Sequence, residues 1–142
     1  MITIGIIDKD HKSRERLISM LEDGSPDQIV GEKPDVFVNF SRDSFNPAAI
    51  HADESHPDIV LIDIEGQDKG SIQNIRTHFP ETQIIVVSES IDTTTVLETF
   101  RNGAANFVQK SSTIDYLFYA IQSSIEDTAD KPEFHLSQIR KN

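Results

Sequence analysis

The chain has 142 residues, no cysteine, and 24 acidic against 13 basic side chains, which gives a formal net charge of −11. This length allows one domain that buries about two-thirds of its unfolded surface, so no disulfide or metal is needed to hold it. The negative charge would repel a phosphate backbone, and we therefore expect no direct nucleic-acid binding. Neither a leader pattern nor an apolar run of about 18 residues occurs, which predicts a soluble, cytoplasmic protein without a membrane segment.

Five short apolar segments predict β-strands. The segment before Asp63 has four consecutive isoleucine, valine or leucine residues, a pattern typical of a strand buried on both faces in a parallel sheet. The segment before Asn39 and Ser41 is more polar, which favours a position near an edge of the sheet. The predicted strands cover residues 1–8, 35–40, 59–63, 83–88 and 106–110.

Helices are predicted between the strands. The last is the clearest, because apolar side chains recur at i, i+3, i+4 and i+7 from Ile114. Asp10 and Asp92 are placed as N-caps of two others, and Pro80 ends a third. The predicted helices cover residues 10–21, 45–54, 71–79, 92–102 and 113–127, and residues 24–34 form an irregular excursion.

Alternation of strands and helices predicts an α/β fold. We expect a doubly wound, five-stranded parallel sheet in the flavodoxin-like order 2-1-3-4-5, with helices on both faces. Residues 1–127 would form this domain. The apolar periodicity lapses around Pro132, so residues 128–142 are interpreted as a C-terminal tail or linker.

Four side chains that could bind a ligand or react lie at the ends of predicted strands, namely Asp8, Asp63, Ser88 and Lys110. In the expected order the first and third strands are neighbours, which brings Asp8 and Asp63 together at the edge where ligands bind. Facing carboxylates repel each other unless a hard cation such as Mg²⁺ neutralises them, and a carboxylate can also form an aspartyl phosphate. A hydroxyl and an ammonium group are suitable partners for phosphoryl oxygens.

In this order and spacing, these segments resemble the receiver domains of bacterial two-component response regulators over residues 2–127. In such domains a proline often follows the lysine, whereas here Ser111 and Ser112 follow Lys110. In this respect the chain is more similar to receivers of the LuxR and NarL type. The matching segments are residues 6–8, 57–63, 86–88 and 103–110.

The resemblance implies a function in signalling. Asp63 would be the phosphoacceptor, receiving a phosphoryl group from a sensor histidine kinase and switching a protein interface. Ser88 would be the switch hydroxyl and Lys110 the phosphate-binding lysine. An output domain or downstream protein would read the switch, and a homodimer is left open.

The resemblance also implies a Mg²⁺ cofactor, held by Asp8, Asp63 and the backbone carbonyl of Glu65. Asp10 is an alternative metal ligand, but its position favours a helix N-cap. Phe107 would be the switch aromatic, although an aromatic at a strand edge more often only fills volume.

Two residues depart from the family pattern. Lys9 follows Asp8 where family members usually carry a second acid, and Glu89 replaces the customary small residue after the switch hydroxyl. Lys9 is interpreted either as a partner of Asp63 or as a solvated turn residue, and both remain open. The loop after Asp63 also lacks the usual Met-Pro pair, which puts Mg²⁺ affinity and phosphorylation in question.

These departures motivate an alternative, a pseudo-receiver that binds proteins without phosphorylation. A third hypothesis is a small hydrolase with Asp63 as nucleophile. The sequence has no cap domain and no second acid immediately after Asp63, so we expect a signalling protein and not an enzyme.

Overall fold

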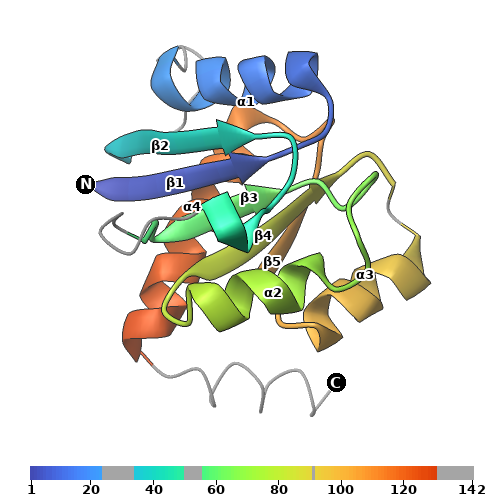
Figure 1. Ribbon diagram of the computed structural model, residues 1–142. Helices are drawn as coiled ribbons and strands as arrows, with labels where there is room; N and C mark the ends of the chain where they lie inside the picture. Colours follow the sequence, from blue (N-terminus) through green and yellow to red (C-terminus); the bar gives the residue numbers. More distant parts are fainter. Residues whose placement is uncertain (24–33, 50–55, 91, 131–142) are drawn as a thin grey trace.

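The computed structural model describes residues 1–23, 34–49, 56–90 and 92–130 (Figure 1). Within these residues, five strands form one parallel sheet in the order β2-β1-β3-β4-β5. The predicted fold class and strand order are therefore confirmed. The strands are β1 Ile2–Ile7, β2 Val36–Arg42, β3 Ile59–Ile62, β4 Gln83–Ser88 and β5 Asn106–Gln109.

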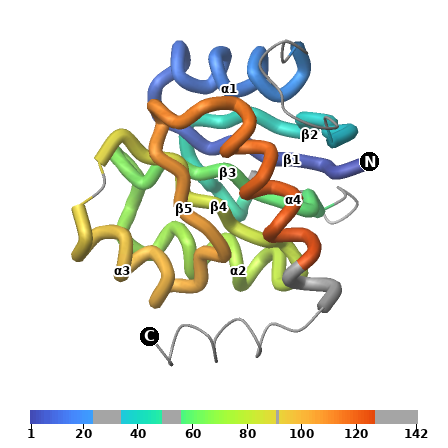
Figure 2. Tube along the Cα trace, turned by 180° about the vertical axis from the view of Figure 1, so that it is seen from behind, coloured from blue at the N-terminus to red at the C-terminus, as the bar shows by residue number. Residues whose placement is uncertain are grey.

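Helices cover both faces of the sheet (Figures 1 and 2). On one face lie α1 and α4, and on the other lie α2 and α3. The helices are α1 His11–Asp23, the short 3-10 helix η2 Pro47–Ala49, α2 Ser71–His78, α3 Thr93–Arg101 and α4 Ile114–Asp130. Among the described helices, none combines the length and the apolar character that a membrane crossing requires.

The core consists of two hydrophobic clusters, one on each face of the sheet. All four residues of β3 are buried, and they alternate between the clusters because successive strand side chains point to opposite faces. Ile59 and Leu61 pack with residues of α1 and α4, whereas Val60 and Ile62 pack with residues of α2. This confirms the interpretation of the central segment as a strand buried on both sides.

Strand β2 lies at an edge of the sheet, as its polar residues indicated. Its pairing with β1 shifts by one residue, because Ile4 faces Val38 whereas Gly5 faces Phe40. The ring of Phe40 fills the space that a Cβ atom on residue 5 would occupy. Glycine is therefore required at this point of the β1–β2 contact.

Two predicted boundaries differ from the structure. Helix α4 continues to Asp130, so it takes in the first residues of the predicted tail. Its apolar periodicity ends earlier, but no helix-breaking residue occurs before Pro132. Of the helix predicted over residues 45–54, the structure describes only η2, and residues 50–55 lie outside the described part. The same holds for residues 24–33 of the predicted excursion and for residues 131–142 of the tail.

Candidate functional site

Two acids meet at the carboxyl edge of the sheet. Asp8 follows β1 and Asp63 follows β3, and these parallel strands are neighbours that pair Ile7 with Ile62. The backbone N–H of Asp63 donates to the carbonyl of Ile7 at 2.9 Å, which continues the ladder to the acids. Asp8 and Asp63 are only 2% and 5% exposed. The predicted juxtaposition of the two carboxylates is therefore present, and both are largely removed from water.

A lysine bridges the two acids. The Nζ atom of Lys110 lies 2.5 Å from Asp63 Oδ2 and 3.0 Å from Asp8 Oδ2, and its side chain is 15% exposed. Burial by itself would lower the pKa of Lys110. The hydrogen bonds and Coulombic attraction of Asp63 and Asp8 outweigh that effect, so the pKa lies above its ordinary value of 10.5. Lys110 is thus charged over the whole physiological range.

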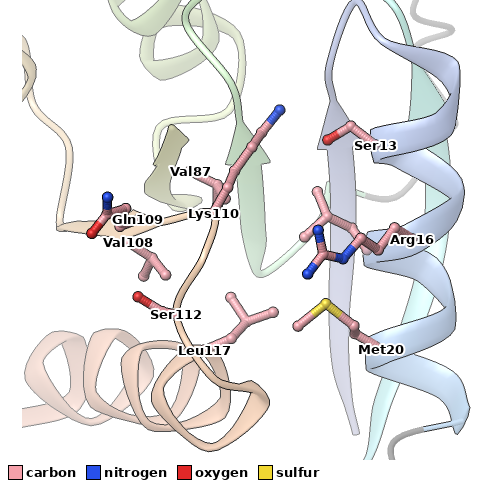
Figure 3. A pocket seen from close by; sticks show the side chains of 10 residues that line it. Ser13, Arg16, Met20, Val87, Val108, Gln109, Lys110, Ser112 and Leu117 are labelled. Atoms are coloured by element: carbon pink, nitrogen blue, oxygen red, sulfur yellow. The ribbon is translucent and has the colours of Figure 1, made fainter. Parts of the chain in front are cut away.

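The stem of Lys110 is held by packing. It lines a small groove between α1 and the start of α4, beside Met20, Val108 and Leu117 (Figure 3). In this view its ammonium group points away from the groove floor. The groove has a volume of only about 30 Å³, against about 330 Å³ for the cavity over the acids, so we interpret it as a packing gap and not as a ligand site.

The two oxygens of each acid have different roles. Oδ1 of Asp8 accepts from the backbone N–H of Asp10 at 2.9 Å, and Oδ1 of Asp63 accepts from that of Glu65 at 3.0 Å. Both Oδ2 atoms face Lys110. Oδ2 of Asp8 is fully buried and accepts no backbone hydrogen bond from the described residues, and its contact is with the ammonium group of Lys110 at 3.0 Å. This oxygen retains the capacity to bind a positive ligand.

Asp10 caps helix α1. Its Oδ1 atom accepts a hydrogen bond from the backbone N–H of Lys12 at 3.0 Å, and its carbonyl accepts from the N–H of Arg14 at 3.0 Å. The N-cap interpretation is therefore confirmed. The same residue also lies at the wall of the cavity above the two acids.

A cavity of about 330 Å³ opens over the acids, and it brings together most of the residues that the sequence singled out. Both departures from the family pattern, Lys9 and Glu89, belong to its wall. No ion pair joins Lys9 to Asp63 within the described residues, and the ammonium group that contacts Asp63 is that of Lys110. The lining residues are Asp8, Lys9, Asp10, Asp63, Glu65, Gly66, Glu89 and Lys110.

Ser88 and Phe107 are set back from this cavity. Ser88 is buried at the end of β4, where its Oγ accepts from the backbone N–H of Ser90 at 3.3 Å. Its carbonyl accepts from the backbone N–H of Lys110 at 2.8 Å, which connects the hydroxyl residue to the lysine. Phe107 is partly buried and packs against the cluster that contains Val60 and Ile62. Its contacts are those of a packing residue.

The acids fit a hard divalent cation. Mg²⁺ in proteins is usually held by one or two carboxylates together with waters, and Asp8 and Asp63 supply two buried carboxylates. Oδ2 of Asp8, which accepts no backbone hydrogen bond from the described residues, is a ligand atom of the required kind. Among the described residues, this site included, no group of three or more histidine, cysteine, aspartate or glutamate side chains is arranged to hold a metal ion, so the site offers a cation two carboxylates and not three.

Sequence reasoning missed one contact that supports Asp8 and another that joins two loops. Nη1 of Arg14 donates to the backbone carbonyl of Asp8 at 2.5 Å, and Nε2 of Gln67 donates to the carbonyl of Asp43 at 2.7 Å. Helical side chains lean toward the N-terminus of their helix, so an arginine soon after Asp8 was a usable signal. The Gln67 contact joins two loops that are far apart in sequence, and no local pattern indicates it.

Comparisons with known proteins extend these observations. No family model matches the chain. The regulatory protein AtoC of Escherichia coli is 31% identical over 87 residues, which is 58% of this chain but only 19% of AtoC. The match therefore spans a small part of that relative.

Solved structures resemble nearly the whole chain. A response regulator from Thermotoga maritima has a TM-score of 0.68 at 22% identity, covering 89% of this chain and 98% of its own. A LuxR-family response regulator from Aurantimonas has a TM-score of 0.72 at 22% identity, covering 89% and 86%. The receiver domain of a putative response regulator NarL from Mycobacterium tuberculosis has a TM-score of 0.68 at 22% identity, covering 88% and 96%. The chain thus has the fold of the receiver domains of two-component response regulators, as its sequence segments indicated.

Proposed function

We propose that this chain is a phosphoacceptor receiver domain, in which Asp63 takes a phosphoryl group from a sensor histidine kinase. The observation that carries the proposal is the cluster of Asp63, Asp8 and Lys110 at the base of an open cavity. Two buried acids bridged by one ammonium group are unusual as mere structural support, because burying charges costs free energy. Strongly interacting buried charges in a cavity are typical of functional sites.

The chemistry follows from the positions of these groups. An oxygen of Asp63 forms a bond to phosphorus while the P–N bond of a phosphohistidine breaks, and the departing imidazole nitrogen takes up a proton. Lys110 then has phosphoryl oxygens to pair with in addition to carboxylate oxygens. Mg²⁺, when bound by Asp8, Asp63 and the carbonyl of Glu65, would offset the negative charge that collects there.

The signal would leave the site through β4 and β5. The backbone hydrogen bond between Lys110 and Ser88 joins the charged group to the end of β4, and α3 begins five residues later, directly after Asp92. A change of charge at Asp63 would shift α3 between two arrangements and alter a protein interface. A downstream protein or an output domain would read that change.

Intact mass after incubation with acetyl phosphate tests the proposal. We expect one phosphoryl adduct that requires Mg²⁺ and that disappears in Asp63→Asn. Asp68→Asn is the matched control, since it removes one carboxylate from the same loop at an exposed position. An adduct that persists in Asp63→Asn, or no adduct in folded wild-type protein, would reject Asp63 as a phosphoacceptor.

A second candidate function is a receiver-like module that binds proteins without phosphorylation. It is favoured by the fact that Lys110 already compensates both acids, so that the site is stable without a cation. The absence of an adduct in the folded wild-type protein would favour this candidate.

A further inference from the structure

The side chain of Lys9 packs along the loop that follows β3. A Cβ atom built on Gly66 would lie 2.6 Å from Lys9 Cδ, 3.5 Å from its Cβ and 3.6 Å from its Cγ. Gly66 has a φ of +77°, a backbone conformation that favours glycine. The lysine stem therefore occupies the space that the missing side chain of Gly66 leaves open.

This contact places a second lysine at the cavity. Lys9 and Gly66 both line it, together with the acids. The ammonium group of Lys110 is already within 3.0 Å of both buried acids. Lys9 lies in the turn between Asp8 and the N-cap Asp10, and its stem lies against Gly66, so its positive charge belongs to the wall of this cavity. The two buried acids thus share their cavity with two positive charges.

We propose that Lys9 weakens divalent-cation binding between Asp8 and Asp63. The proposal rests on the proposed function, because it takes the same cavity as the cation site. A positive charge in the wall of the same cavity repels a divalent ion and so opposes its binding. With Lys9 present, the acids are compensated mainly by the protein's own ammonium groups.

Titration calorimetry with Mg²⁺ on purified protein, without any phosphodonor, tests this directly. We expect Lys9→Met to lower the Mg²⁺ dissociation constant by about tenfold, a size in keeping with the repulsion between one unit charge and a divalent ion across solvent. Lys12→Met is the matched control, since Lys12 is exposed on α1 and lies outside the cavity lining. It removes the same formal charge from the molecule, and we expect its dissociation constant to stay within about twofold of wild type.

Lys9→Arg separates charge from bulk. Because it keeps the positive charge, it should bind Mg²⁺ as weakly as wild type does. An equal effect of Lys9→Met and Lys12→Met would overturn the proposal, as would tightening by Lys9→Arg. Failure of both wild type and Lys9→Met to bind Mg²⁺ would also overturn it.

These outcomes are distinct from failure of the proposed function. If acetyl phosphate labels Asp63 but Lys9→Met leaves Mg²⁺ affinity unchanged, the phosphoacceptor stands and the role of Lys9 falls. If Lys9→Met tightens Mg²⁺ binding but no protein is labelled, the cavity is a cation site that Lys9 controls and the phosphoacceptor falls.

Discussion

At the scale of single residues, Lys110 is the group on which the site depends most. It is the bridging cation for two acids that are nearly inaccessible to water. Removing it in Lys110→Met would leave two buried carboxylates facing each other. We expect the free energy of unfolding at pH 7 to fall by about 3–5 kcal/mol, as when one partner of a buried ion pair is lost. Urea denaturation measures this, with the exposed Lys69→Met as control.

The pH dependence of this effect has a definite sign. The pKa of Lys110 is raised in the folded protein above its ordinary value of 10.5, so its stabilising contribution is complete below that value. The contribution is lost as the pH rises through the folded-state pKa. The stability difference between wild type and Lys110→Met should therefore shrink above about pH 10.5. Other groups that titrate at this pH are present in both proteins and cancel in the comparison. A stability difference that stays constant above about pH 10.5 would contradict the raised pKa of Lys110.

At the scale of elements, the start of α3 depends on one side chain. Asp92 Oδ2 accepts from both the backbone N–H and the hydroxyl of Thr95, each at 3.1 Å. The first three residues of the helix are threonines, which are poor helix formers. Asp92→Ala should cost about 1 kcal/mol and speed amide hydrogen exchange in α3, whereas Asp92→Asn should retain most of the cap. Unchanged exchange in α3 would show that tertiary packing alone holds the helix.

The contact between β1 and β2 gives a second prediction at this scale. A methyl group on residue 5 would overlap the ring of Phe40. Gly5→Ala should lower the free energy of unfolding by about 1–3 kcal/mol, as overpacking of a core does. In a double-mutant cycle, Phe40→Leu should recover part of that loss, because the smaller side chain vacates the space. Additive effects of the two substitutions would contradict the contact.

How far the sequence predicts these elements depends on the range of the interactions involved. Periodicity predicts β3 and α4, and a local side-chain bond predicts the cap at Asp92, because each is set within a few residues. The observed end of α4 at Asp130 lies beyond the predicted one, since polar residues that continue a helix give no apolar signal. The bridge made by Lys110 and the packing of Lys9 on Gly66 depend on segments more than 40 residues apart, and no local pattern encodes them.

At the scale of the whole molecule, the large negative charge lowers the stability of the folded state, and the buried ion pairs do not offset this effect. The formal net charge is −11, and further acids at the cavity add to the local repulsion. Self-repulsion of this kind destabilises the compact state, and salt screens it between exposed groups. Within the site, by contrast, the contacts of Lys110 with Asp8 and Asp63 are short and buried, so salt should affect them little.

Raising NaCl from about 0.01 M to about 0.15 M shortens the screening length from roughly 30 Å to roughly 8 Å. We therefore expect the urea midpoint at pH 7 to increase over this range. The control is the same protein near pH 4.7, its calculated isoelectric point, where the net charge and hence the gain should nearly vanish. A gain of equal size at both pH values would mean that salt acts on apolar burial, since that effect does not depend on net charge. A rise in the urea midpoint that is confined to pH 7 would show that repulsion between acidic groups lowers the stability of the folded state.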